Sequence, residues 1–238
     1  MNKLIILLFF GINSLLYSQT ENLEIKNLAR RYDSGEFSAE DYRQLARDWH
    51  ELLNDMGGFP ELPYDSVRKQ IRFEYVFETG LSKSVVFNRI LEWSAVYFGS
   101  LNHVLHYENK ESGKIILKGN FDVTHRKNYK NFWGNPKEGI SQTTCYNTYQ
   151  FTIKDNKIKI EISNIEFEIN YGGYLSANVY IPNRLVNISI HDLYPITDFD
   201  SGEWKEKLDL LNQTNRKITN IVNSMFIYIK EYTNDYAF

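Results

Sequence analysis

The chain has 238 residues, of which 42% are hydrophobic and 24% are charged, and its formal net charge at pH 7 is −3. This length suits one large domain with an appendage, or two small domains. A weakly acidic chain is a poor candidate for binding nucleic acid, which requires clustered positive charge. Because Cys145 is the only cysteine, an intramolecular disulfide is excluded and stability must come from packing.

Residues 1–18 have the pattern of a secretory signal peptide. A short start containing Lys3 precedes an apolar run from Leu4 to Leu16, and Ser18 is a small residue in front of Gln19. The run is too short to cross a bilayer of about 30 Å as a helix. We therefore expect cleavage between Ser18 and Gln19, a mature chain without a transmembrane segment, and a periplasmic or secreted location.

Residues 19–58 are expected to form a helical hairpin. Its second helix begins at Ser38, and Asp41 stands three residues later in the position of a capping box. The apolar residues of this helix recur at helical spacing: Tyr42, Leu45, Ala46, Trp49, Leu52, Leu53 and Met56. One face of the hairpin therefore needs a partner, and the segment resembles short hairpin modules of bacterial envelope proteins. Residues 59–68 contain two prolines and are the expected linker to a domain at residues 69–238.

From Ile71 the hydrophobic period changes from 3.6 to 2, which marks the start of a sheet. Alternation from Ile71 to Phe77 predicts a half-buried strand, and Ser82 is then expected to cap a helix. The helix has two apolar lines, so we expect the sheet to cover one side and another helix to cover the other. The two lines contain Val86, Ile90, Trp93 and Tyr97, and Phe87, Leu91 and Phe98.

Four more strands follow in the pattern: His103–Glu108, Lys114–Val123, Thr143–Lys154 and Lys157–Asn170. In the last of these the apolar phase slips by one residue, because Ile160 and Ile162 are even whereas Ile165 and Phe167 are odd. A β-bulge near Ser163-Asn164 would keep Ile160 and Phe167 on the same covered face. A further possible strand lies at residues 185–190.

The last helix is expected to start near Asp200 or Ser201 and to end near Tyr232. Its core stripe contains Trp204, Leu208, Leu211, Ile218, Val222, Met225 and Ile229. An unbroken helix of thirty residues would span about 45 Å, so we expect a kink or break near residues 213–215. The order strand, helix, four strands, helix defines an α+β fold, in which helices pack on one face of an antiparallel five-stranded sheet.

Four stretches of this domain carry a family resemblance: Ile71–Phe77, Gly80–Lys83, Leu91–Phe98 and Gly113–Gly119. They resemble the family catalogued as domain of unknown function 4468, and the similarity extends over roughly residues 71–170. The resemblance implies a TATA-binding-protein-like fold and a secreted or envelope protein of Bacteroidetes-type bacteria. It transfers no functional residue, and the fold name implies nothing about DNA, because function depends on the site.

Catalytic and metal motifs are incomplete. The stretch from His50 to Asn54 lacks the second histidine of a zinc-protease helix, and His103 and His106 should point to opposite faces of a strand. Cys145 shares its strand parity with apolar residues, which favours burial over a nucleophilic role. No cofactor is expected.

The acidic residues Asp198, Asp200 and Glu203 could be read as a calcium cage. Their spacing before Gly202 is one residue too short for that motif, so helix capping is the better interpretation.

One candidate partner-binding surface is the long loop expected between the third and fourth strands, at residues 125–137. Its basic and aromatic residues are Arg126, Lys127, Tyr129, Lys130, Phe132 and Trp133, flanked by His125 and Lys137. Such a mixture suits an envelope protein or an anionic glycan or lipid head group. The competing interpretation, to which we give the greater weight, is a satellite core formed by Phe132 and Trp133 with merely solvated lysines.

A second candidate is the open face of the sheet. The residues expected there are Glu74, Val76, Ile116, Lys118, Tyr146, Gln150, Lys159 and Glu161. Their mixed polarity is more typical of ordinary solvent exposure than of a binding surface.

Together these features favour an exported, non-enzymatic binding or assembly module of a bacterial envelope. Two alternatives stay open: an enzyme acting on envelope polymers through carboxylates that no motif groups, and a carrier of an apolar ligand held between the sheet and its helices.

Overall fold

The computed structural model describes residues 38–40, 43–44, 47, 51, 58, 62–65, 67–130, 136–171, 174–176, 179–181, 184–196 and 203–231. The strands are β1 (Tyr64–Asp65), β2 (Gln70–Ile71), β3 (Phe73–Glu78), β4 (Leu105–Asn109), β5 (Lys114–Lys130), β6 (Pro136–Lys154), β7 (Lys157–Tyr171), β8 (Tyr174–Ser176), β9 (Val179–Ile181) and β10 (Arg184–Ser189). The helices are α3 (Lys83–Phe98), α4 (Leu101–Val104), α5 (Ile190–Leu193) and α6 (Glu203–Glu231). The elements expected at residues 19–58 lie largely outside the described residues, and the division of the chain into domains stays a prediction.

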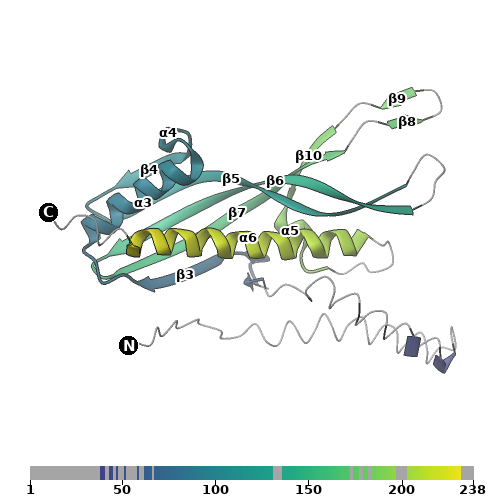
Figure 1. Ribbon diagram of the computed structural model, residues 1–238, viewed down its shortest axis with the longest axis horizontal. Helices are drawn as coiled ribbons and strands as arrows, with labels where there is room; N and C mark the ends of the chain where they lie inside the picture. The colour runs from purple at the N-terminus through teal and green to yellow at the C-terminus, as the bar shows by residue number, and fades with distance from the viewer. Residues whose placement is uncertain are drawn as a thin grey trace.

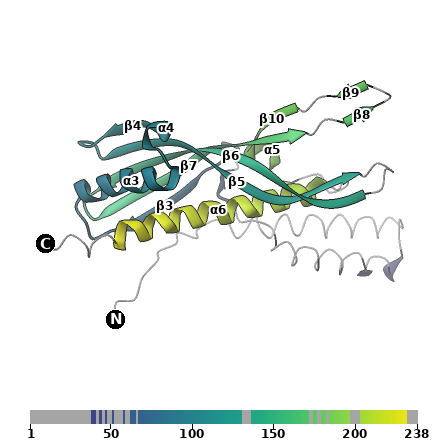
Figure 2. The ribbon, with the colours of Figure 1, turned by 45° about the horizontal axis from the view of Figure 1, so that its top comes forward.

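The main sheet is antiparallel, with strand order β10-β7-β6-β5-β4, and β3 pairs with β7 beside this path. Strand β7 is long enough to pair with β3 through residues 157–162 and with β10 through residues 166–171, so β3 and β10 share one edge. The sheet therefore has six strands arranged in five positions. Figures 1 and 2 show α3 and α6 on the same face of the sheet, which confirms the α+β arrangement expected from the sequence.

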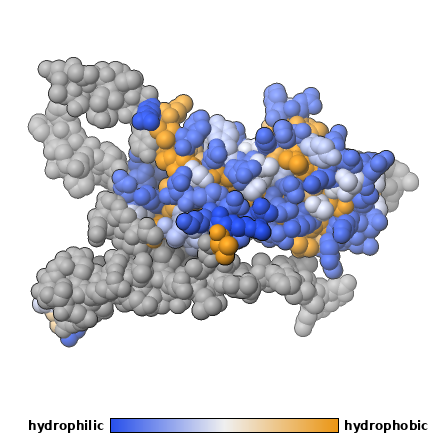
Figure 3. Space-filling view, turned by 180° about the vertical axis from the view of Figure 1, so that it is seen from behind, coloured by the Kyte–Doolittle hydropathy of each residue, from blue (hydrophilic) through white to orange (hydrophobic). Residues whose placement is uncertain are grey.

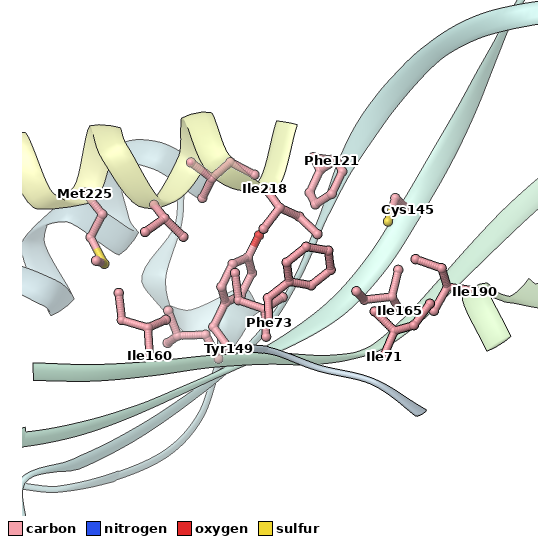
Figure 4. Close-up of a cluster of buried hydrophobic side chains, with 14 of the residues drawn as sticks. Ile71, Phe73, Phe121, Cys145, Tyr149, Ile160, Ile165, Ile190, Ile218 and Met225 are labelled. Carbon is pink, nitrogen blue, oxygen red and sulfur yellow. The ribbon is translucent and has the colours of Figure 1, made fainter. Parts of the chain in front are cut away.

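The core lies between this covered face and the two helices. Alternate residues of β5, β6 and β7 are fully or almost fully buried, among them Leu117, Phe151 and Ile160. Figure 4 shows Ile218 and Met225 of α6 facing Tyr149 and Ile160 of the sheet. All residues expected in the core stripe of α6 are buried: Trp204, Leu208, Leu211, Ile218, Val222, Met225 and Ile229. Leu62, in the segment expected to be a linker, also belongs to this core.

Helix α3 packs as its two apolar lines predicted, except that Tyr97 at the end of the first line is exposed. Val86, Ile90 and Trp93 are buried, and the helix contacts both α6 and β6. The N-cap is Ser82, but its side chain makes no capping hydrogen bond. Instead the backbone N–H of Lys83 donates to Oδ1 of Asp155, at 2.9 Å, from the turn between β6 and β7. The start of the helix is thus fixed by a residue distant in sequence.

The bulge expected near Ser163-Asn164 is confirmed. Thr148 pairs with Ser163 and Tyr146 pairs with Glu166, so the register of β6 and β7 shifts between them. Asn164 accommodates the extra residue with a positive φ of 51°, a left-handed conformation that asparagine tolerates better than most residues. As a result Ile160 and Phe167, on either side of the bulge, are both buried.

Two expectations about the helices and strands were wrong. Helix α6 continues from Glu203 to Glu231 as one element, without the break expected near residues 213–215. Burial of Leu210, Leu211 and Thr214 on that stretch explains why, because the helix is packed where it was expected to fail. His103 lies in the short helix α4 and not in a strand, and β4 begins only at Leu105.

Candidate functional site

The segment expected to be a long loop after Val123 is a two-stranded ribbon. Strands β5 and β6 keep their register without interruption from Lys114↔Thr152 to Lys130↔Pro136. Strand β6 pairs with β7 only from Thr144 onward, so beyond that point the β5–β6 pair continues alone. We call residues 123–130 and 136–143 the distal ribbon. Figure 1 shows it running past the N-terminal end of α6, apart from the arm that carries β8 and β9.

The inner side of the distal ribbon is built on His125, which is 3% exposed. Its Nδ1 lies 2.8 Å from the carbonyl oxygen of Arg126, and its Nε2 lies 2.9 Å from the hydroxyl of Thr143 on the paired strand. A carbonyl can only accept, so Nδ1 carries the proton, and in the neutral ring Nε2 accepts from Thr143. The contact with Thr143 therefore joins the two strands, whereas the contact with Arg126 lies within β5. His125 is a core residue and not part of a binding surface.

Helix α6 holds the same point of the ribbon through Asp209. This carboxylate is 5% exposed and accepts a 2.6 Å hydrogen bond from the backbone N–H of Arg126. Its second oxygen accepts from the side-chain amide of Gln213 at 3.2 Å. On the next turn, Asn212 donates to the carbonyl oxygen of Gly58 at 2.7 Å. The N-terminal half of α6 thus fixes two segments that are far apart in the sequence.

The outer side of the distal ribbon is exposed. Arg126 is exposed there and is paired in register with Ile140, of which 81% is exposed. Lys127, the next residue, is half-buried. Strand alternation therefore divides the basic cluster between two faces, which the sequence reading of a single loop did not anticipate.

The remaining residues of this candidate are less fully described. The backbones of Tyr129 and Lys130 lie in β5, opposite Lys137 and Pro136. Phe132 and Trp133 lie outside the described residues, so their proposed roles, in a partner site or a satellite core, stay predictions.

The structure also describes several residues that were considered as nucleophiles or metal ligands. Cys145 is fully buried, and burial raises the pKa of its thiol to about 12, which disfavours the nucleophilic thiolate. His103 and His106 are exposed on α4 and β4. His50, Asp198 and Asp200 lie outside the described residues, whereas Glu203 begins α6. In the described part of the chain no three metal-ligating side chains come together.

The open face of the sheet contains every residue expected on it, because each has the strand parity opposite to the buried residues. Glu161 is its most connected residue and accepts from Arg72 at 3.1 Å and from Gln150 at 3.2 Å. Lys159 lies between two carboxylates, 2.9 Å from Glu74 and 3.6 Å from Glu161, and the hydrogen bond that it donates to Glu74 raises the pKa of its ammonium group. Figure 3 shows this side of the molecule as largely hydrophilic, with separate apolar patches.

Asp209 and Thr143 are the residues that sequence reasoning missed. Asp209 follows Leu208 on a helix and would ordinarily be assigned to the solvent side, because charged residues are seldom buried without partners. Its position directly beside the apolar stripe, with Asn212 one turn later, was the only available signal.

Among the described helices, none has the length and apolar character needed to cross a membrane.

The chain was compared with known protein families and solved structures. Residues 73–168 match the model of the family described as a domain of unknown function (DUF4468) with a TBP-like fold. The resemblance found in the sequence is thereby confirmed over these residues. No curated protein matches the chain.

Two solved structures are similar. One is a TBP-like protein from Parabacteroides distasonis ATCC 8503, with 18% identity, coverage of 71% of this chain and 96% of that chain, and a TM-score of 0.51. The other is a DUF4468 family protein from Bacteroides ovatus ATCC 8483, with 11% identity, coverage of 69% and 90%, and a TM-score of 0.46. At its level of identity, the first likeness shows the fold alone.

Proposed function

We propose that this chain, whose residues 73–168 form a DUF4468 domain with a TBP-like fold, is an exported, non-catalytic binding module of a bacterial envelope. The apolar run ahead of Ser18 supports export. The proposed binding surface is the outer side of the distal ribbon together with the residues that connect its strands. Its proposed partner is an anionic surface, supplied by a glycan or by lipid head groups.

The observation that carries the proposal is the exposed pair Arg126 and Ile140 on a fixed support. Exposed Ile140 offers an apolar contact and Arg126 beside it offers a cation, a combination that suits an anionic partner with apolar parts. On the inner side His125 and Asp209 hold the backbone of Arg126. A surface held in this way is already ordered, so that binding costs less conformational entropy.

Charge supports the same choice of partner. Residues 125–137 contain Arg126, Lys127, Lys130 and Lys137 and no acidic residue, although the whole chain is negative. A local excess of basic residues attracts anionic surfaces, with about 1 kcal/mol gained per basic residue near an anionic membrane. The attraction is screened by salt.

The binding test uses vesicles of phosphatidylglycerol and phosphatidylcholine, and separately a soluble sulfated polysaccharide. We expect sedimentation with the anionic vesicles or retention by the polysaccharide, and loss of that binding in the variant Arg126→Ala with Lys127→Ala and Lys130→Ala. Added salt should weaken the wild-type interaction in the same assay.

The matched control removes three exposed cations elsewhere, as Lys110→Ala with Arg216→Ala and Lys217→Ala, and should bind as the wild type does. Equal loss of binding in both triple variants would mean that binding depends on the net charge of the protein and not on the distal ribbon. Absence of wild-type binding to either anionic probe at low salt would overturn it. Export is tested separately, since a native protein that keeps Met1 would contradict cleavage after Ser18.

A further inference from the structure

The open face of the sheet has a charge pattern that is complementary to itself. Six successive rows of residues cross the strands on this face, from the row of Lys154 to the row of Thr144. The charged residues next to the β6–β7 turn are mostly basic, whereas those in the last two of the six rows are all acidic. The latter are Asp122, Glu166 and Glu168. The face is therefore polarised along its strands.

The rows alternate in a specific order. Each row is named by its residue in β6. The first three rows contain Lys154 with Lys157 and Glu78, Thr152 with Lys114 and Lys159, and Gln150 with Glu74 and Glu161. The last three contain Thr148 with Lys118 and, beside it, Arg72, then Tyr146 with Glu166, and then Thr144 with Asp122 and Glu168. Their net signs are thus positive, positive, negative, positive, negative, negative. Reversing this order changes the sign of every row.

That antisymmetry is the property an isologous interface requires. A two-fold axis that runs across the strands, between Gln150 and Thr148, places each row over a row of opposite sign in a second copy. The row of Lys154 then faces the row of Thr144, and the row of Thr152 faces the row of Tyr146. Complementary charge in an interface sets both orientation and partner choice.

The same face also has apolar side chains available for contact. Four exposed large hydrophobic residues of the described chain lie on it outside the distal ribbon: Val76, Tyr107, Tyr146 and Leu185. No helix covers this face in the described structure, since α3 and α6 pack on the other one. Two antiparallel sheets can pack face to face in this manner, about 10 Å apart.

We propose that two copies of this chain associate through the open faces of their sheets, with their strands running in opposite directions across the interface. The occupant of the open face is a second copy because the row pattern is complementary to itself. This proposal is independent of the distal ribbon and of the partner it binds.

The test measures self-association of the purified full chain by sedimentation velocity over a range of concentrations. We expect a dimer at low salt whose dissociation constant rises as salt is added. Reversing the row of Thr144 with Asp122→Lys and Glu168→Lys should weaken the dimer by at least about tenfold, because like charges then face each other. Reversing the basic end with Lys154→Glu and Lys157→Glu should do the same.

Mixing the two reversed variants separates the proposal from simple loss of folding. Each variant alone should dimerise at least about tenfold more weakly than the wild type, and the mixture should form a heterodimer, because the reversed row of Thr144 in one chain then faces the reversed row of Lys154 in the other. The control Arg216→Glu with Lys217→Glu changes charge by the same amount on the exposed side of α6 and should dimerise as the wild type does. A monomeric wild type, unaffected variants, or a mixture that stays monomeric would each overturn the proposal.

Discussion

In the body of the sheet, strands β5 and β6 bury Leu117 and Phe151 beneath the helices, whereas in the distal ribbon the same strands bury His125 and Thr143. The body is held by a continuous apolar contact area, which stabilises in proportion to the surface removed from water. The ribbon is instead held at single atoms, by the hydrogen bonds of the His125 ring and by the bond that Asp209 accepts from the backbone of Arg126. The stability of the body therefore depends on how much apolar side-chain volume is buried, and that of the ribbon depends on the geometry of a few hydrogen bonds.

This difference has a consequence for where function can reside. Regions with few buried apolar contacts open locally at a lower free energy than the core of the same domain. Loss of the hydrogen bonds that hold the ribbon should therefore leave the body folded. Its outer residues can also change with little loss of stability, because Arg126 and Ile140 lie outside the core.

The largest expected effect is in the body. Trp93 is 3% exposed and its ring stacks on Tyr97 and meets Phe98 edge-on. Trp93→Ala should lower the free energy of unfolding by about 3–5 kcal/mol, because it empties a buried aromatic site. Denaturant titration measures this loss. Val96→Ala, at a position 72% exposed on the same helix, should change it by less than about 0.5 kcal/mol, and a loss below about 1 kcal/mol for Trp93→Ala would contradict the packing.

The next largest loss of stability is expected at Asp209, which anchors the distal ribbon to α6. Asp209→Ala removes the acceptor of the Arg126 N–H and should cost about 1–3 kcal/mol, the range for a buried donor left without a partner. Hydrogen exchange should speed up at Arg126 and along the distal ribbon, and stay slow in the body.

A neutral acceptor distinguishes hydrogen bonding from charge at this anchor. Asp209→Asn keeps an oxygen that can accept from Arg126, so it should lose less stability than Asp209→Ala. If exchange rises equally throughout the sheet in both variants, the ribbon and the body open as one unit and the comparison between them fails.

A smaller effect is expected at the bulge, where the body ends. Asn164 has a positive φ of 51°, and a left-handed conformation costs most residues about 1–2 kcal/mol. Asn164→Ala should therefore destabilise the protein by about 1 kcal/mol, whereas Asn164→Gly should be close to neutral. Thermal unfolding of the pair measures the difference. Equal destabilisation by both substitutions would assign the effect to the hydrogen bond from Asn164 to Thr148 and not to the backbone.

The sequence was a good guide to the body for the same reason that the body is stable. Period-two alternation marks which face of β7 is covered, and the phase slip at Ser163-Asn164 located a real bulge. The open-face residues followed from parity alone. Helix α3 was likewise predictable, since Trp93 and Ile90 repeat at helical spacing.

The ribbon could not be predicted in this way, because its residues lack that alternation. Between Thr124 and Lys130 the chain is mostly polar or charged. Its strand character comes from pairing with residues 136–142 and from Asp209, which lies far along the sequence. The Asp155 cap of α3 is a further case, since a single sequence gives no sign that Asp155 and Lys83 meet. Long-range polar contacts carry little local signal.

The smallest expected effect is on the outer side of the ribbon, and it tests the comparison most directly. Arg126→Ala with Ile140→Thr changes an exposed cross-strand pair without touching the backbone bond to Asp209. The free energy of unfolding should change by less than about 0.5 kcal/mol, while binding to an anionic surface should fall. His125→Ala, at the neighbouring residue but on the inner side, should by contrast lose stability, since it leaves Thr143 without its buried partner. A stability loss from the outer pair as large as that from His125→Ala would mean that the outer side belongs to the core, and the ribbon would then have no surface available for a partner.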